Sequence, residues 1–271
     1  MRLLAIIVSY YPDLDLLRRN LESITDYVDK ILIWENTPEK DKFKYRLEPT
    51  DKLIYLGDGI NSISRGLNNG WKYAKENGYD YLLLLDQDSI FQNLDYYLSK
   101  TIDNPKAPVG IWGPEVNEKK ANEEFEEVET CITSGMLLSV QIIDKIGGWD
   151  ELFPIDSVDL DFCICASELG IKTYMVKGAF LKQRFGNTKI LRIFGKDKIQ
   201  RNYPSKRLYS YYRDILILNK KHPENQFVKK SLIVRLKLIK GILFYESDRI
   251  NKAIAIFKGI IAGLTYSHKA N

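Results

Sequence analysis

The chain has 271 residues, of which 45% are hydrophobic and 28% charged, values that are ordinary for a soluble globular protein. No uncharged apolar run reaches the ~20 residues of a membrane-spanning helix. The apolar start of the sequence is not followed by the small-residue cleavage site that a signal peptide needs. Cys131, Cys163 and Cys165 do not suggest a disulfide framework. Cys163 and Cys165 could bind a metal, but partly buried thiols are the better interpretation. We therefore expect a cytoplasmic protein that is not integral to a membrane.

The formal net charge of +4 hides a strong asymmetry along the chain. Residues 1–181 contain 19 Lys+Arg and 31 Asp+Glu, whereas residues 182–271 contain 21 and 5. A basic end on an acidic body predicts an anionic partner, such as a membrane surface, a nucleic acid or a lipid phosphate. No nucleic-acid recognition motif accompanies the basic charge, so we do not expect a nucleic-acid partner.

Strands and helices are predicted to alternate over the first 90 residues. We expect strands at 3–9, 30–35, 52–56 and 81–85, with helices at 14–28 and 61–77 between them. This order predicts an α/β fold with a mostly parallel, doubly wound sheet and right-handed crossovers.

The next stretch of the chain has a more mixed pattern. It predicts helices at 94–101, 141–146 and 159–169, strands at 109–114 and 171–176, and a solvated loop at the charge-rich 117–129. We place a first domain at residues 1–181, with one half at about 1–90 and the other at about 91–181.

The remaining segment, 182–271, is predicted to be a basic loop followed by amphipathic helices. The loop covers 182–206, and the helices cover 207–221, 227–245 and 248–266. These helices either dock on the first domain with a solvated outer face or attach the protein peripherally to an anionic membrane.

Two carboxylates follow the predicted strand at 81–85. Four leucines lead directly into Asp86-Gln87-Asp88, as in a strand that is buried on both faces. Ligands of open α/β sheets bind beyond the carboxyl ends of the strands, and a hard divalent cation would relieve the repulsion between two close carboxylates. The motif therefore predicts either a metal–diphosphate site or a plain strand-ending turn.

A second acidic cluster precedes the helix predicted at 159–169. Five acidic residues lie among glycines and aromatic side chains in the segment 147–161. Capping of the helix explains some of these carboxylates. The interleaved Trp149, Phe153 and Ile155 fit better with a pocket wall in which one carboxylate acts as a base.

These segments together resemble the family 2 glycosyltransferases of the GT-A fold. The matching motifs, in chain order, are Ser9-Tyr10, Leu85-Asp86-Gln87-Asp88-Ser89, Ser134-Gly135-Met136, and Gly148-Trp149-Asp150-Glu151 through Asp159. The Asp-Gln-Asp-Ser form resembles the bacterial rhamnosyltransferase-like branch. The resemblance covers nearly the whole chain, from Leu3 to about Gly263. It implies that residues 1–181 are the catalytic domain, with a nucleotide-sugar half at about 1–90 and an acceptor half at about 91–181.

The resemblance implies an inverting sugar transfer from a nucleoside diphosphate sugar. Asp86 and Asp88 would hold Mg²⁺ or Mn²⁺, and Asp159 would be the catalytic base. The donor nucleotide would be bound by Val8, Ser9, Tyr10, Glu35, Asn61, Arg65 and Asp86. The acceptor would be bound by Ser134, Gly135, Trp149, Asp150 and Asp156.

The sequence departs from the family pattern at four positions. Tyr11 stands where Asn is common, Glu35 where Asp is usual, and Pro154 where an aromatic residue is usual. Gln183 lies near the position of a histidine that can complete the metal site. Gln183 offers a carbonyl oxygen in place of an imidazole, and Lys182 or Arg184 could instead carry part of the diphosphate charge.

We predict a hexosyltransferase that uses dTDP-rhamnose to build a cell-surface polysaccharide such as a capsule or cell-wall glycan. Its partners would be the nucleotide sugar and a glycan or polyprenyl-diphosphate-linked acceptor, with a possible anionic membrane surface. UDP-galactofuranose, UDP-glucose or UDP-galactose are the alternative donors. A nucleotidyltransferase is a more distant alternative, but Ser9-Tyr10-Tyr11-Pro12 is not a Gly-rich phosphate loop. An inactive sugar-binding homologue is the remaining one.

Overall fold

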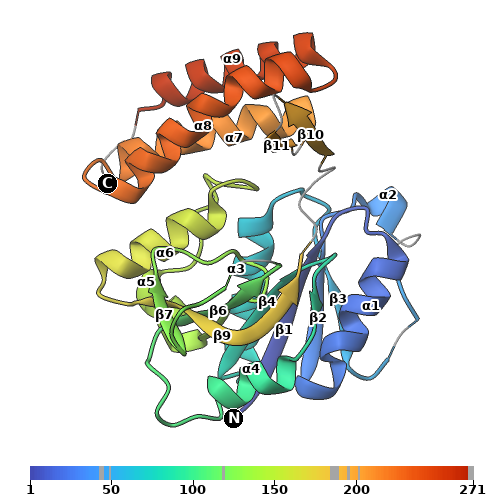
Figure 1. The fold of residues 1–271 in the computed structure, drawn as a ribbon. Helices are drawn as coiled ribbons and strands as arrows, with labels where there is room; N and C mark the ends of the chain where they lie inside the picture. Colours follow the sequence, from blue (N-terminus) through green and yellow to red (C-terminus); the bar gives the residue numbers. More distant parts are fainter. Residues whose placement is uncertain are drawn as a thin grey trace. The chain divides into compact units, whose positions relative to one another are not determined.

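A computed structural model shows two compact units, Met1–Arg184 and Phe185–Asn271. The structure describes residues 1–42, 46–48, 50–117, 120–183, 189–193, 196–200 and 202–267. Each unit is described by itself below, and its elements carry the labels of Figure 1.

The first unit is an α/β domain built on one large sheet. Its elements are β1 (Leu3–Ser9), α1 (Leu14–Ile24), η1 (Thr25–Tyr27), β2 (Lys30–Glu35), α2 (Glu39–Lys42), β3 (Leu53–Leu56), α3 (Ile63–Glu76), β4 (Tyr81–Asp86), β5 (Ile90–Phe91), α4 (Leu94–Lys100), β6 (Ile111–Val116), β7 (Phe125–Val128), β8 (Leu137–Ser139), α5 (Val140–Ile146), α6 (Val158–Glu168) and β9 (Thr173–Lys182).

The sheet begins with a parallel half in the order β3-β2-β1-β4. Its register sets Val8 beside Asp86 and Ser9 beside Glu35. The predicted strands and their parallel arrangement are therefore confirmed in this half. Because all four strands run the same way, their carboxyl ends meet at one edge of the sheet, where ligands of open α/β sheets bind.

Helices cover both faces of this parallel half (Figure 1). Residues that alternate along a strand point to opposite faces. Ala5 and Ile7 of β1 share a core with Leu17 and Leu21 of α1. The side chain of Ile6 faces the other way and lies against Gly70 of α3. Nearly continuous apolar strands are needed for such a two-sided core, and β1 is buried throughout.

The second half of the sheet is mixed. Strand β8 is antiparallel to both β4 and β6, while β6 and β9 pair in parallel with an irregularity between Pro114 and Glu115. The prediction of a solvated loop at 117–129 was wrong for Phe125–Val128, which forms β7 and pairs antiparallel with β9. Its sequence, Phe125-Glu126-Glu127-Val128, does not alternate, and none of its side chains is fully buried, so the local pattern gave no strand signal.

The described residues of the second unit form a hairpin and three helices. Its elements are β10 (Lys189–Ile193), β11 (Lys196–Gln200), α7 (Ser205–Lys221), α8 (Gln226–Tyr245) and α9 (Arg249–Thr265). The prediction of a loop over 182–206 was wrong for β10 and β11, which pair as an antiparallel hairpin. The sequence there has too few apolar residues to indicate a strand. The three predicted helices are confirmed to within two residues at each end.

Helices α7, α8 and α9 enclose a small core of their own. Tyr212 of α7 is fully buried with Ile242 of α8 and Ile256 of α9. Lys252 and Glu246, both buried, form an ion pair of 2.8 Å at the turn between α8 and α9. In the part of the chain that the structure describes, no helix is long and apolar enough to cross a membrane.

Glycine is required at Gly135, which precedes β8. Its φ of +85° lies in the left-handed region, and an added Cβ would lie 2.5 Å from Pro114 Cγ. Gly147 at the end of α5 has a similar φ of +92° but nothing within 4 Å of the added Cβ. The pair therefore separates backbone strain from steric overlap.

We predict that Gly135→Ala lowers the free energy of unfolding by about 2–4 kcal/mol, since overpacking adds to the cost of the left-handed conformation. Gly147→Ala should cost only about 1–2 kcal/mol. Urea unfolding of the two variants measures the difference. Equal losses would show that the contact with Pro114 relaxes without cost.

Candidate active site

Two carboxylates and one amide meet where β4 and β9 end. Gln183, the residue after β9, donates from Nε2 to Asp86 Oδ2 at 2.8 Å and to Asp88 Oδ1 at 3.5 Å. Asn117 holds the Gln183 backbone by two hydrogen bonds, one to its carbonyl oxygen at 3.0 Å and one from its N–H at 3.1 Å. The carboxylates of Asp86 and Asp88 therefore converge on one point.

A chain of buried hydroxyls lies next to this point. Ser89 Oγ donates to Gln183 Oε1 and is also hydrogen-bonded to Ser134 Oγ. Ser134 Oγ accepts from the Asp86 backbone N–H at 3.2 Å, and both serine side chains are fully buried. Ser134, predicted to contact the acceptor, thus lies beneath Asp86. Gly135 is also buried, and its N–H donates to Leu84 O at 2.7 Å.

These groups fit a hard divalent cation. Oxygen ligands are what Mg²⁺ and Mn²⁺ prefer, and two carboxylates already face one point. The amide N–H of Gln183 partly offsets the repulsion between them, as a bound cation would do more strongly. A rotation of the Gln183 amide would present its carbonyl oxygen to the ion in place of its NH₂ group. Lys182 is exposed, and Arg184 lies outside the described residues.

The end of β1 is joined to the same loop by a second amide. Gln87 Oε1 accepts from the Tyr10 N–H at 2.7 Å, and Gln87 Nε2 donates to the Tyr10 carbonyl at 3.3 Å. Val8 and Ser9 are buried beneath this contact, while the Tyr10 side chain is 40% exposed. The predicted nucleotide-binding residues at the end of β1 therefore lie beside the Asp86 loop.

Glu35, predicted to face the nucleoside, ends β2 next to Ser9. Its carboxylate is buried and accepts from Arg46 Nε at 2.9 Å. This hydrogen bond and the negative charge of Glu35 raise the pKa of the Arg46 guanidinium above its ordinary value. A buried, paired carboxylate is held in a single orientation, which is useful in a binding site.

Arg65 lies near the start of α3. Its guanidinium bonds the Asp58 carboxylate and lies 3.7 Å from Glu151 Oε2. The bond to Asp58 raises the pKa of Arg65, which remains charged. Asn61, half-buried, precedes the N-cap residue Ser62. Arg65 would have to leave part of this acidic contact in order to pair with a diphosphate.

Two buried polar groups near this region were missed in the sequence. Asn36 Nδ2 donates to Ser62 O at 3.1 Å, but Asn36 Oδ1 has no hydrogen-bond partner among the residues that the structure describes. The same holds for Trp34 Nε1. Unpaired buried polar atoms are costly and cluster at functional sites. The signal was available, since both residues flank Glu35 at the end of a predicted strand.

The segment with the second acidic cluster is held to α3 by hydrogen bonds. Asn68 accepts from the Trp149 N–H at 2.8 Å and donates to the Trp149 carbonyl at 2.8 Å. The Trp149 ring is buried and stacks on Phe162 of α6 with centroids 4.5 Å apart. Asp150 Oδ1 accepts from the Leu152 N–H at 2.9 Å. Trp149 thus acts as the anchor of this segment.

Asp159 lies in the first turn of α6. The preceding N-cap residue, Ser157, has a φ of +66°, which is unusual for a residue other than glycine. Such strain is held in place only where surrounding contacts demand it, and it is common at functional sites. Asp159 is half-buried and its Oδ1 accepts from the Leu160 N–H at 2.8 Å, while Asp156, just before the helix, is buried.

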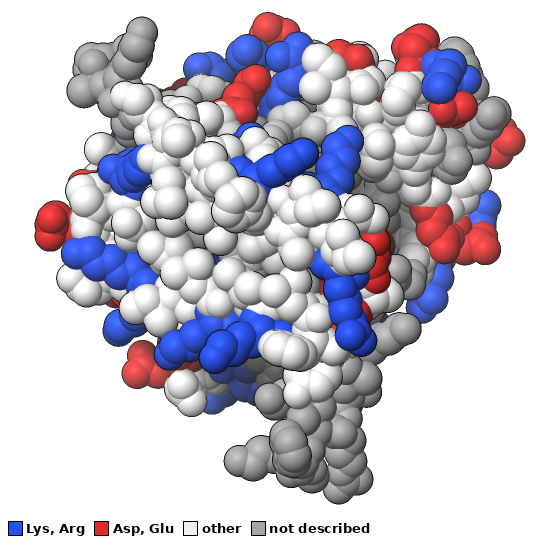
Figure 2. Space-filling view, turned by 90° about the horizontal axis from the view of Figure 1, so that it is seen from above, with Lys and Arg blue, Asp and Glu red and all other residues white. Residues whose placement is uncertain are grey.

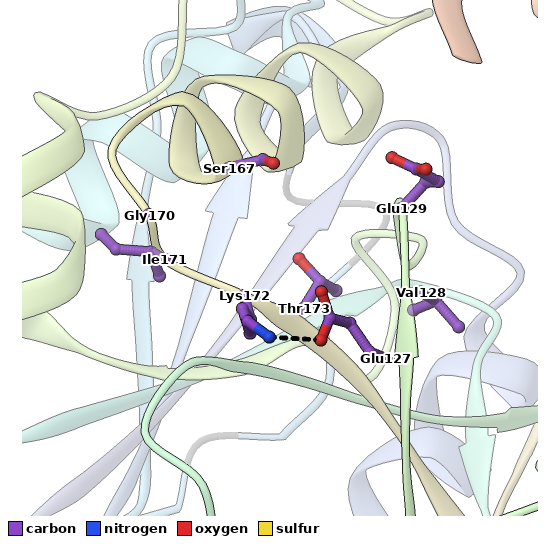
Figure 3. A pocket seen from close by; sticks show the side chains of 8 residues that line it. All are labelled: Glu127, Val128, Glu129, Ser167, Gly170, Ile171, Lys172 and Thr173. Carbon is purple, nitrogen blue, oxygen red and sulfur yellow. Dashed lines mark hydrogen bonds and ion pairs between the residues drawn. The ribbon is translucent and has the colours of Figure 1, made fainter. Parts of the chain in front are cut away.

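A hollow of about 480 Å³ lies at the other end of β9 from Gln183. Figure 3 shows Lys172 reaching Glu127 across it, with an ion pair of 2.6 Å. That hydrogen bond raises the pKa of the Lys172 ammonium. The hollow contains none of the predicted site residues.

Comparison with known proteins agrees with this geometry. The chain is 27% identical over 240 residues to the dTDP-rhamnosyl transferase RfbF of Shigella flexneri. The match covers 80% of this chain and 80% of RfbF. This similarity supports the resemblance of the motifs to the family 2 glycosyltransferases. No family model matches the sequence.

Solved glycosyltransferases show that its fold is GT-A. The mannosyltransferase PcManGT from Pyrobaculum calidifontis, in complex with GDP-Man and Mn²⁺, superposes with a TM-score of 0.62 at 10% identity, over 97% of this chain and 87% of that one. GalNAc-T7 with UDP, GalNAc and Mn²⁺ gives 0.56 at 12% identity, over 80% of this chain. The match spans only 48% of the GalNAc-T7 chain.

The Gln183 amide provides a test of the shared site. We predict that Gln183→Glu, without added divalent metal, lowers the free energy of unfolding by about 1–3 kcal/mol, because a donor to Asp86 is lost and a third carboxylate is added. Added Mn²⁺ should reduce this loss of free energy of unfolding relative to the unaltered chain. Thermal unfolding at neutral pH with and without Mn²⁺ measures both effects.

The control is Gln92→Glu, which adds the same charge at an exposed position. Its stability should change little in either condition. If Gln183→Glu is as stable as Gln92→Glu without metal, then the three groups do not share one electrostatic environment.

Proposed function

We propose that this glycosyltransferase moves L-rhamnose from dTDP-rhamnose, with inversion, to a hydroxyl of a glycan or lipid-linked acceptor in cell-surface polysaccharide synthesis. The convergence of Asp86, Asp88 and Gln183 at the carboxyl edge of the sheet carries the transferase part of this proposal. The likeness to RfbF favours the rhamnose donor. UDP-galactofuranose, UDP-glucose and UDP-galactose are the alternative donors. The reaction would take place in the cytoplasm.

Asp86 and Asp88 would hold Mg²⁺ or Mn²⁺ at the diphosphate. The bound ion would offset the negative charge that the leaving diphosphate gains. Gln183 would keep the two carboxylates at one point, because its own backbone is fixed by Asn117. Ser89 and Ser134 would support this arrangement from below.

The nucleotide would lie over the ends of β1 and β2. Val8, Ser9 and Tyr10 form the floor there, and Glu35 is oriented by Arg46 for hydrogen bonding. Asn61 and Arg65 lie at the start of α3, where backbone N–H groups and the helix dipole favour an anion. Arg65 adds a cation that two acidic neighbours keep oriented.

The acceptor would lie near the start of α6. As the acceptor oxygen attacks the anomeric carbon, the bond from that carbon to the diphosphate oxygen breaks, and Asp159 takes the hydroxyl proton. Trp149, Asp150 and Asp156 would line the acceptor side. Ser134 and Gly135 would shape it through the backbone that they hold beneath Asp86.

We predict that Asp159→Asn lowers kcat by ~10²–10⁴-fold, the usual contribution of a positioned base, while the donor KM changes little. The control Asp144→Asn alters a carboxylate that pairs with Lys75 at 2.8 Å on α3 and should retain full activity. Steady-state release of nucleoside diphosphate with acceptor present measures both. Full transferase activity of Asp159→Asn would show that another group accepts the proton.

A donor screen tests the substrate. We predict that dTDP release from dTDP-rhamnose exceeds UDP release from each UDP-sugar, and that a chelator suppresses it until Mg²⁺ or Mn²⁺ is restored. Faster release from a UDP-sugar would select one of the alternative donors. No release from any donor would identify an inactive sugar-binding homologue.

A further inference from the structure

Helix α9 has one face that packs on α7 and an opposite face that is exposed and apolar. Its inner face packs closely on α7: a Cβ added at Gly259 would lie 2.4 Å from Tyr209 O, and one added at Gly263 would lie 2.7 Å from Leu216 Cβ. Its outer face carries a stripe at helical spacing that consists of Ile250, Ile254, Phe257, Ile261 and Leu264, with exposed fractions from 44% to 77%. The close packing of the inner face leaves this stripe as the outer surface.

Helix α8 exposes further apolar side chains, and cationic ones lie among them. Ile233, Val234 and Phe244 are 51%, 56% and 67% exposed. Lys230, Lys237 and Lys240 are exposed on the same side of the helix by its 3.6-residue period. Single exposed apolar residues are normal, but several on each of two successive helices indicate an interaction surface.

The charge on these two helices has one sign. Between Gln226 and Tyr245 and between Arg249 and Thr265 there is no Asp or Glu. The basic residues of the two helices are Lys229, Lys230, Arg235, Lys237, Lys240, Arg249, Lys252 and Lys258. Figure 2 looks onto this side of the helical unit and shows a broad uncharged surface with blue Lys and Arg side chains on it and around it.

The chemistry of this surface selects its occupant. A second copy of the chain would bring two cationic faces together, which costs free energy at close range. A nucleic acid would match the cations but not the isoleucines and phenylalanines. An anionic bilayer matches both, since its headgroups attract Lys and Arg while its acyl region accepts apolar side chains.

We propose that the α8–α9 face, defined by the exposed apolar and basic residues named above, binds in the plane of an anionic lipid membrane. Ile250, Ile254, Phe257, Ile261 and Leu264 insert between the headgroups. Lys230, Lys237 and Lys240 contact the lipid phosphates. No described helix is suited to cross the bilayer, so the attachment is peripheral and reversible.

Flotation with vesicles tests this surface. The full chain should float with vesicles of phosphatidylglycerol and phosphatidylcholine, and much less with phosphatidylcholine alone. Phe257→Asp/Ile261→Asp should lower the partition coefficient at least about tenfold, because apolar burial is lost and charge is added. Lys230→Glu/Lys237→Glu/Lys240→Glu should weaken binding mainly at low salt, and much less at about 1 M NaCl, where the Debye length is about 3 Å.

Matched controls separate this surface from a general effect. Leu169→Asp adds a carboxylate at another exposed apolar side chain, 57% exposed, and should float like the unaltered chain. Circular dichroism should show the native helix content in all variants, since the altered side chains are exposed. Absence of flotation by the unaltered chain, or full flotation of Phe257→Asp/Ile261→Asp, would overturn the proposal.

Light scattering coupled to size exclusion adds a further test. The unaltered chain could be a dimer and the Phe257→Asp/Ile261→Asp variant a monomer, with neither protein floating. That result would show that the face joins two copies and would overturn membrane binding. Release of nucleoside diphosphate to water, with no membrane present, should be equal in all variants. Flotation without any such release would overturn the transferase proposal and leave the membrane surface intact.

Discussion

Two like charges at the end of one buried strand are the constraint on which the catalytic domain depends. The apolar residues of β4 hold Asp86 and Asp88 at the carboxyl edge of the sheet, where neither carboxylate can retreat far from the other. Gln183 relieves the repulsion, and it comes from the end of β9, 97 residues further along the chain than Asp86. Gln183 reaches this place because β9 pairs in parallel with β6, and β8 pairs antiparallel with both β6 and β4. The antiparallel strand β8 therefore serves the site as directly as the parallel strands do.

Side-chain amides take a recurrent part in this site. Gln183 joins Asp86 to Ser89, Gln87 joins the β4 loop to the end of β1, and Asn68 clasps Trp149 to α3. An amide both donates and accepts, so each one can satisfy two backbone or side-chain groups at once. An amide that makes two such hydrogen bonds orients a loop without adding charge. The carboxylates therefore remain the main source of charge at this edge of the sheet. Loops positioned on a rigid scaffold in this way are a common arrangement for binding and catalysis.

The two units differ in the way they use charge and apolar surface. The α/β domain places its apolar residues inside and its carboxylates at a functional edge. The helical unit buries a small core between α7, α8 and α9 and leaves a second apolar stripe of α9 outside. Helices α8 and α9 contain basic residues but no Asp or Glu, so their own sequences leave a net positive charge.

Much of this protein could be predicted from local sequence. Apolar runs at β1, β2 and β4 predicted the parallel half-sheet, because strands buried on both faces must be continuously hydrophobic. Asp86 and Asp88 stood out because two close carboxylates follow a buried strand, whereas Asp159 was assigned by the family resemblance. The three C-terminal helices were clear from their period. The strand β7 and the hairpin of β10 and β11 were missed, since short polar strands depend on pairing partners that the local sequence does not name.

Only the tertiary structure decided which distant groups meet. The sequence placed Gln183 near a metal site by resemblance, but its hydrogen bonds to Asp86 and Ser89 follow from the register of β6 and β9. Periodicity alone also showed that α9 has an apolar stripe without showing which way it faces. The glycines at 259 and 263 settle that direction, because only a face without side chains lets α9 approach α7 so closely. Local propensity determines which elements form, whereas packing over long sequence separations determines what each face of an element touches.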